Sequence, residues 1–182
     1  MQLQFKQLLF FVLIISSFSL AQNAKAQFNP YDDGRKIGTV GVGFSGWGIP
    51  IFGRLEVPIV DNITVGGGLS FRTYSESFAG SRWRHNIFGI NALGNYHFNE
   101  LFEFTDEWDL YAGLTLGYYA WGTSFDGNNI DGVDYRGNGN GGLGIGAQIG
   151  GRYFFQDNIA VNLELGGGNV VAGGNIGVSF LF

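Results

Sequence analysis

Apolar residues alternate with small or polar residues along most of this chain, with a period of two. Val40, Val42 and Phe44, for example, are separated by Gly41 and Gly43. This is the period of a β-strand, in which successive side chains point to opposite faces. The alternation recurs in eight stretches, which predict strands at about 35–45, 51–59, 63–74, 83–98, 108–121, 141–155, 159–166 and 175–182. The sequence therefore predicts an all-β fold.

The predicted connections differ between the two ends of the sheet. Two related turns, 60–62 and 156–158, are predicted to be three-residue loops whose last residue, Asn62 or Asn158, adopts the left-handed conformation. The Gly-, Asn- and Asp-rich stretch 122–140 is a predicted loop at the other end. Short turns at one end and long loops at the other are typical of outer-membrane barrels.

Two further connections are expected between strands. Residues 75–82 are a predicted loop, and residues 99–107 are an acidic connection that is longer than the barrel pattern expects.

A transmembrane barrel and a soluble β-sandwich would show the same alternation with the two faces exchanged. The apolar faces carry no charge over the centre of any strand. Aromatic residues stand near their ends, as the girdles of a membrane barrel do: Phe44, Phe71, Tyr96, Phe98, Trp108, Tyr118, Tyr153 and Phe182. In a sandwich these large side chains would crowd into a core about 10 Å thick. Residues 35–182 are therefore predicted to form an eight-stranded, antiparallel, up-and-down transmembrane β-barrel.

The N-terminal residues have the layout of a secretory signal. Lys6 precedes an apolar run at 8–20, and Ala24-Lys25-Ala26 is an A-x-A cleavage site. The run is shorter than the roughly 20 residues that a membrane-spanning helix needs. Residues 1–26 are therefore predicted to be a cleaved signal peptide and 27–34 a lead-in to the barrel. Sec-type export to the outer membrane of a Gram-negative cell follows.

Composition limits the remaining possibilities. The length predicts a single domain, and the absence of cysteine excludes disulfides. Without Lys6 and Lys25, the exported part holds 8 basic and 15 acidic residues, a net charge of −7. Nucleic acid is not an expected partner, because no basic patch exists to hold it.

The inward faces carry the strongest functional signal. Three arginines balance three acids in a predicted lumenal network of Arg54, Arg72, Arg152, Glu56, Asp109 and Glu164. The interior of an eight-stranded barrel has room only for side chains, so we expect a polar plug rather than a pore. If Phe98 pairs with Trp108, His97 faces Asp109 and joins the network.

Other chemistry has weaker support. Of the two histidines, His97 is predicted close to the periplasmic end, and His85 lies near the outer rim without an acid at a recognisable spacing, so a catalytic triad is not expected. Asp126, Asp131 and Asp134 offer oxygen ligands for a weak cation site in the 122–140 loop, although solvated loop composition explains them equally. No metal or cofactor is assigned.

The last strand is predicted to act as an assembly signal. Ile176, Val178, Phe180 and Phe182 share its apolar face, and the strand finishes on the aromatic Phe182. An apolar outer face with a small or polar inner one suits the closing strand of a membrane barrel. The barrel-assembly machinery is therefore an expected partner.

The segment Trp108-Asp109-Leu110-Tyr111-Ala112-Gly113, followed by Leu116-Gly117-Tyr118-Tyr119, resembles the small OmpA/OmpX-type outer-membrane β-barrels, especially those of Bacteroidota. The eight-strand meander and the Phe-ended strand share this resemblance. It implies one of several roles, because members are structural proteins, adhesins, assembly factors or, occasionally, lipid-modifying enzymes. The peptidoglycan-binding domain of OmpA itself is not found, so cell-wall anchoring is not expected.

The sequence predicts a non-enzymatic, monomeric outer-membrane barrel in contact with lipid and lipopolysaccharide. Its role would be structural, or would be to present external loops to an unidentified ligand. A lipid-modifying enzyme is one alternative, which a change in lipid mass would reveal. A narrow channel is another, which would pass current across a planar bilayer.

Overall fold

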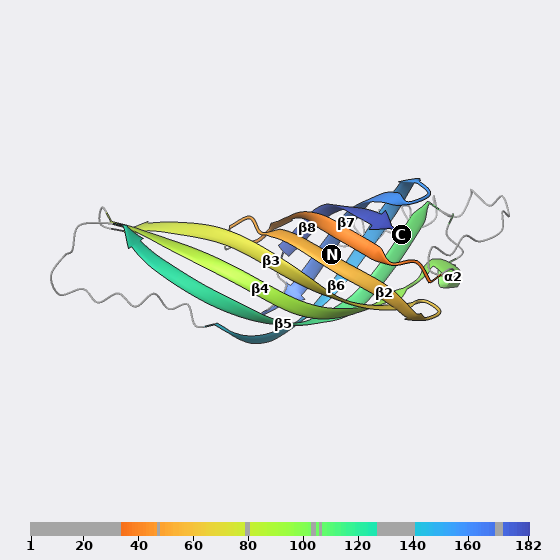
Figure 1. The fold of residues 1–182 in the computed structure, drawn as a ribbon, viewed down its shortest axis with the longest axis horizontal. Helices are drawn as coiled ribbons and strands as arrows, with labels where there is room; N and C mark the ends of the chain where they lie inside the picture. Colours follow the sequence, from red (N-terminus) through yellow and green to blue (C-terminus); the bar gives the residue numbers. More distant parts are fainter. Residues whose placement is uncertain are drawn as a thin grey trace, which may run out of the picture.

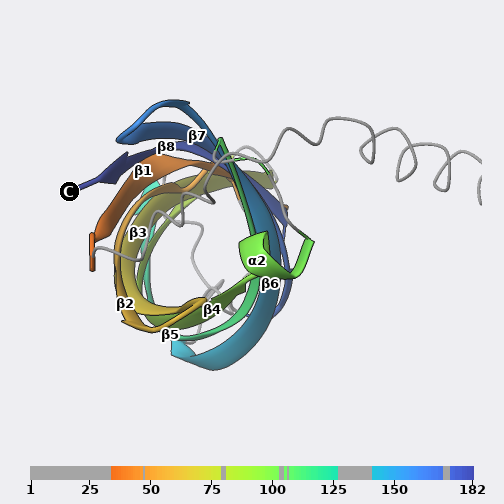
Figure 2. The ribbon, with the colours of Figure 1, turned by 90° about the vertical axis from the view of Figure 1, so that its right-hand side faces the viewer.

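Eight antiparallel strands form a closed barrel in the computed structural model, which describes residues 34–46, 48–78, 81–102, 105, 107–126, 141–169 and 173–182. Each strand pairs with its neighbour in sequence, and the first pairs with the last (Figures 1 and 2). The strands are β1 (Ile37–Phe44), β2 (Ile51–Val60), β3 (Ile63–Phe78), β4 (Ser81–His97), β5 (Trp108–Asp126), β6 (Gly142–Gln156), β7 (Ile159–Gly168) and β8 (Gly173–Leu181). The predicted fold class is confirmed.

The first and last strands close the barrel. β1 and β8 are in register from the pair Ile37 and Leu181 to the pair Phe44 and Gly174. Backbone hydrogen bonds between Lys36 and Phe182, at 2.7 and 3.0 Å, extend this ladder. Closure removes the open edges of the sheet, which in lipid would cost several kcal/mol for each unsatisfied backbone group.

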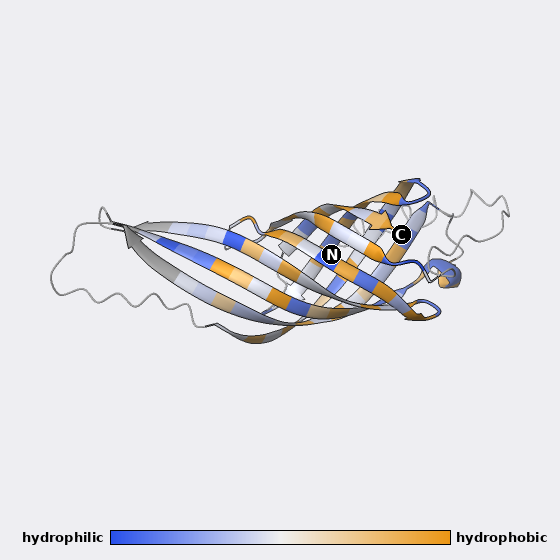
Figure 3. Cartoon of the chain, in the orientation of Figure 1, coloured by the Kyte–Doolittle hydropathy of each residue, from blue (hydrophilic) through white to orange (hydrophobic). Residues whose placement is uncertain are grey.

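The outer surface of the barrel is apolar. Side chains in the middle of the strands are exposed although they are hydrophobic; Leu114 and Ile145 are each 60% exposed and Leu163 is 59% exposed. Figure 3 shows hydrophobic positions recurring along the strands. Aromatic side chains flank this belt, and the rings of Trp108 and Tyr153 lie 5.0 Å apart at one end. A continuous apolar surface of this kind is the face that a membrane barrel turns to lipid.

Glycines on the inner wall make room for large side chains on neighbouring strands. A Cβ on Gly150 would overlap the ring of Tyr111, and one on Gly89 would overlap the ring of Tyr119. A Cβ on Gly66 would meet the backbone and side chain of Glu56. The many glycines of the sequence therefore let a narrow barrel hold large polar side chains.

The tight turns differ in detail from the sequence expectation. Val60 pairs with Ile63, so two residues are unpaired, and a bulge lies between Pro58 and Val60. Asn62 has the expected left-handed conformation, with φ 62°. Asn158 was expected to share it, but Asn62 is the one non-glycine residue with positive φ in the described part of the chain. That expectation was wrong: the second turn has the same pairing pattern, with Gln156 paired to Ile159 beside a bulge, and it closes without a left-handed Asn.

Three strands are longer than the sequence pattern indicated. Residues 75–82 were expected to be a loop, and β5 was expected to end at Trp121; both expectations were wrong. β3 and β4 remain paired to Phe78 and Ser81, and β4 and β5 to Arg82 and Asp126. We call residues 72–78, 81–87 and 120–126 the β3–β5 extension, which reaches well beyond the other strands at the left of Figure 1.

The outermost residues of the extension, at 75–78, 81–82 and 122–126, escaped prediction because the apolar outer face ends before them. Outward residues such as Thr73, Ser75 and Asn86 are polar and exposed, and the inward residues His85 and Ile87 are buried. The period of two continues, but the apolar outer face that marks the other strands is lost. Of the predicted cation loop, Asp126 is the last residue of β5, and Asp131 and Asp134 lie outside the described residues.

The acidic connection after β4 contains a short helix, α2 (Asn99–Phe102). The Asn99 side chain accepts a hydrogen bond from the Leu110 N–H at 3.1 Å, and the ring of Phe102 lies 6.1 Å from that of Phe98. Leu101 is 64% and Phe102 60% exposed. The described part of the connection therefore places exposed apolar side chains next to the aromatic Phe98. None of the helices in the described residues is long or apolar enough to cross a membrane.

The two ends of the barrel carry different elements. The turn end carries the turns at residues 61–62 and 157–158 together with α2, and the extension end carries the β3–β5 extension (Figure 1).

The lipid-facing assignment predicts a position-dependent cost for a new charge. Leu114→Arg places a cation in the middle of the apolar belt and should destabilise the barrel by about 2–4 kcal/mol in lipid vesicles. Ser75→Arg, on the polar outer face of the extension, should change stability by less than about 0.5 kcal/mol. Urea unfolding of both variants measures the difference, and equal effects would contradict a lipid-facing belt.

Candidate functional site: the lumenal charge network

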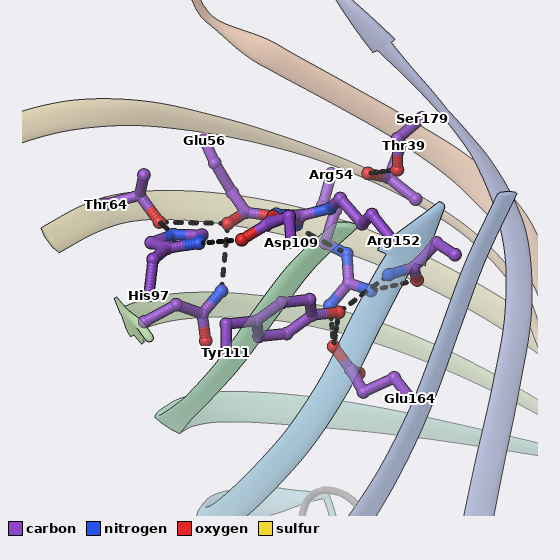
Figure 4. A network of polar contacts seen from close by, with 12 residues as sticks. Thr39, Arg54, Glu56, Thr64, His97, Asp109, Tyr111, Arg152, Glu164 and Ser179 are labelled. Carbon is purple, nitrogen blue, oxygen red and sulfur yellow. Dashed lines mark hydrogen bonds and ion pairs between the residues drawn. The ribbon is translucent and has the colours of Figure 1, made fainter. Parts of the chain in front are cut away.

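Arg152 lies at the centre of the lumen, on β6, with its side chain fully buried. One guanidinium nitrogen donates to Oε1 of Glu56 on β2 at 2.5 Å, and another donates to Oδ2 of Asp109 on β5 at 2.9 Å. The guanidinium also lies over the ring of Tyr111, 4.4 Å from its centroid. Arg152 therefore joins strands on opposite sides of the barrel (Figure 4).

A second ion pair lies beside the first. Arg54 on β2 donates to Glu164 on β7 at 2.7 Å and to the Asn162 side-chain oxygen at 3.1 Å. The Tyr111 hydroxyl donates to the same oxygen of Glu164 at 2.8 Å, and Asn175 donates to the other at 3.0 Å. Both oxygens of Glu164 therefore have partners, as burial of a carboxylate requires.

Amide and hydroxyl groups connect the acids to the rest of the lumen. Oε2 of Glu56 accepts from Thr64 at 3.0 Å and from the Asn95 side chain at 2.9 Å. Asn95 in turn accepts from Gln148, and Gln148 accepts from Thr115, each at 2.9 Å. None of these neutral residues was predicted to belong to the network, and neither were Tyr111 and Asn162, although the alternation placed them on the inward faces. Their inward position and polar side chains were the available signal.

His97 bridges two of these groups. Its Nδ1 lies 2.7 Å from Oδ1 of Asp109, and its Nε2 lies 3.0 Å from the Thr64 hydroxyl oxygen. The single hydroxyl proton of Thr64 is directed to Glu56, so Nε2 must donate to Thr64. Nδ1 must likewise donate to the Asp109 carboxylate. Because both acids also accept from Arg152, we assign the imidazolium form to His97.

This assignment makes the buried network electrically neutral. Three positive charges come from Arg54, Arg152 and the His97 imidazolium. They balance the three negative charges of Glu56, Asp109 and Glu164. Arg72 was predicted to belong to this network. Instead, Arg72 donates to the Ser45 hydroxyl at 3.1 Å and lies over the ring of Tyr119 at 5.5 Å. Among the described residues, no carboxylate pairs with it.

The pairing of β4 with β5 also differs from the expectation. Phe98 was expected to pair with Trp108, which would place His97 opposite Asp109. Instead Tyr96 pairs with Ala112 and His97 with Tyr111. The register is shifted because the connection from Phe98 to Leu110 includes α2 and its Asn99 hydrogen bond. His97 and Asp109 still meet, because residues two positions apart on neighbouring strands are within reach of long side chains.

The Thr64, His97 and Asp109 side chains have the connectivity of a hydroxyl–histidine–acid triad. All three are buried, with exposed fractions of 0 or 1%. The Thr64 hydroxyl proton is committed to Glu56, and Nε2 of His97 acts as a donor, so His97 cannot accept that proton as a base. The other predicted candidate, His85, lies in the extension between Tyr74 and Trp121, with ring centroids 6.2 and 6.3 Å away. The described residues contain no group of three or more His, Cys, Asp or Glu that could hold a metal ion.

Disrupting the second ion pair should destabilise the barrel strongly. Glu164→Ala leaves the buried Arg54 without its carboxylate, and we expect a loss of about 3–5 kcal/mol. Asp157→Ala, in the exposed turn between β6 and β7, should cost less than about 0.5 kcal/mol. Urea unfolding in lipid vesicles measures both. A similar small loss for the two variants would argue against a tightly coupled network.

The hydrogen-bond pattern predicts two N–H groups on the His97 ring. Nitrogen-15 NMR of the folded barrel should detect a proton coupled to each ring nitrogen of His97. The signals that disappear from the spectrum of the His97→Gln variant are those of His97. A ring nitrogen without a proton would overturn the neutral network.

Comparisons with known proteins complete the description of the barrel. No protein-family model matches this chain, and neither does any curated protein. A major outer membrane protein from Thermus thermophilus is similar in structure, with TM-score 0.55 and 13% identity over 81% of this chain and 99% of that one. Neisserial surface protein A is similar with TM-score 0.50 and 12% identity, over 81% and 95% of the two chains.

At such low identity, these similarities show a shared fold. The closed barrel and its apolar outer belt are the features that a bacterial outer membrane requires, because every backbone group is satisfied within the barrel wall. The chain has the fold of the small outer-membrane β-barrels, together with an apolar outer belt suited to lipid.

Proposed function

We propose that this protein is a non-enzymatic barrel that presents the β3–β5 extension to a protein partner outside the cell. The observation that carries the proposal is the reversal of polarity along β3 and β4. Outward side chains are apolar up to Phe71 and Phe88, and polar beyond them. This reversal indicates that the extension leaves the lipid and stands in water.

The outer face of the extension is suited to polar contacts. Thr73, Ser75, Arg84 and Asn86 are all exposed on it, and the Thr73 hydroxyl donates to the Asn86 side chain at 3.1 Å. Such exposed polar side chains can form hydrogen bonds with a partner and fix its orientation.

The extension also offers strand edges. β3 pairs with β2 only as far as Phe71, and β5 pairs with β6 only as far as Tyr119. Within the described residues, the parts of β3 and β5 beyond these points pair with β4 alone. A partner could add a strand to one of these edges, with backbone hydrogen bonds supplying affinity.

The interior supports a binding role over the two alternatives. A neutral network of bonded side chains crosses the lumen, which does not favour a channel. The Thr64, His97 and Asp109 arrangement is buried, and the Thr64 hydroxyl proton is directed to Glu56 rather than to His97, which does not favour a lipid-modifying enzyme.

The other parts of the proposal rest on the sequence. Residues 1–26 would direct export, and Ile176, Val178, Phe180 and Phe182 would be read by the barrel-assembly machinery. Lipopolysaccharide would contact the outer belt, and the barrel would be a monomer. These remain predictions.

Site-specific photo-crosslinking on intact cells tests the binding role. A benzophenone side chain at Ser75, on the extension, should form an adduct with a protein, whereas one at Leu114, in the lipid belt, should not. Purified wild-type barrel should compete for the Ser75 adduct. A competitor in which residues 74–85 are replaced by Asn-Gly, joining the paired residues Thr73 and Asn86, should not. Equal competition by both barrels, or no protein adduct at Ser75, would contradict the proposal.

A further inference from the structure

A cavity occupies the lumen on the extension side of the charge network. Its volume is about 90 Å³, and Arg54 and Glu164 of the network line it. Arg72, Ser70 and Asn91 also line it, on β3 and β4. One buried water needs roughly 10–15 Å³ by the same measure, so the cavity has room for a small ion with several waters.

Arg72 gives this cavity an excess positive charge. Arg54 and Arg152 each contact at least one carboxylate, whereas Arg72 pairs with none among the described residues. Its guanidinium is held in place by the Ser45 hydroxyl and the Tyr119 ring, contacts that carry no formal negative charge. Glu164 does not offset this charge, because it is already paired with Arg54 and bonded to Tyr111 and Asn175.

Two neutral polar side chains that line the same cavity can also bind a ligand. In the described part of the chain, neither the Ser70 hydroxyl nor the Asn91 carboxamide forms a side-chain hydrogen bond with another residue. Both line the same cavity as Arg72, and each can donate a hydrogen bond. The cavity therefore combines an uncompensated guanidinium with available neutral donors.

We propose that this cavity binds a small oxyanion such as phosphate, sulfate or a free carboxylate, with Arg72 as its principal contact. The planar guanidinium presents parallel N–H groups that match the oxygens of such an ion. Ser70 and Asn91 would donate to its remaining oxygens. The ion would enter from the extension end, because the charge network fills the lumen toward the turn end. This site is distinct from the partner-binding surface proposed above.

Phosphate titration followed by NMR tests the site. The probe is inorganic phosphate added to the wild-type barrel in detergent micelles, with chloride at equal ionic strength as the reference. We expect saturable shifts of the Ser70 and Asn91 signals. Arg72→Gln should weaken phosphate binding at least tenfold, and Arg72→Lys should weaken it less, since it keeps the charge but loses the planar fork. Arg84→Gln, on the outer face of the extension, should leave the affinity unchanged.

The source of the anion is tested separately. In phosphatidylcholine nanodiscs, free phosphate should bind as it does in micelles, whereas phosphatidic acid in the disc should not shift Ser70 or Asn91. Shifts caused only by the lipid phosphate would overturn a lumenal site. Equal affinity in Arg72→Gln, or shifts that never saturate, would also overturn it. If Arg72→Gln does not fold, the test rests on which residues of the wild-type barrel shift when phosphate is added. Shifts confined to outward residues such as Arg84 would contradict the proposal.

Discussion

The narrow lumen of an eight-stranded barrel is the constraint on which the rest of this structure depends. Side chains fill the space around Arg152, which has no exposed surface, so its charge must be compensated by the protein itself. Glu56 and Asp109 provide that compensation from different strands. The network therefore crosses the barrel because opposite charges must meet inside it.

Neutrality explains how the inward charges are divided. The network contains three acids. Their negative charges are balanced by two arginines and the His97 imidazolium, without Arg72. Each acid also accepts hydrogen bonds from neutral groups or from a second cation, as buried carboxylates require. Arg72 lies outside this closed set, toward the extension end, where it lines a cavity rather than a filled lumen. The barrel interior thus has a neutral, packed part and a more open, positively charged part.

A second constraint sets the polarity of the outward side chains, and it changes where the lipid ends. Between the aromatic girdles, outward positions must be apolar, since lipid offers no hydrogen bonds. Along β3 and β4 the outward positions become polar beyond Phe71 and Phe88, and inward residues such as His85 and Ile87 are buried. The same alternation of inward and outward side chains is therefore used in both lipid and water. The extension can remain a sheet in water while the barrel below it remains a sheet in lipid.

The sequence by itself determined the strands within the lipid, their outward belt, the inward position of Glu56, Arg152 and Glu164, and the left-handed Asn62. These follow from a period of two and from local backbone preference, which are properties of neighbouring residues. The outermost residues of the extension, at 75–78, 81–82 and 122–126, were missed because a strand without an apolar outer face resembles a loop in sequence.

Only the tertiary structure decided which inward residues meet. The pairing of His97 with Tyr111, the place of Arg72 outside the network and the contributions of Thr64, Asn95 and Asn162 depend on strand register and on the stagger of the closed barrel. Stagger fixes the height of each residue in the lumen, and periodicity along one strand carries no information about the height of another.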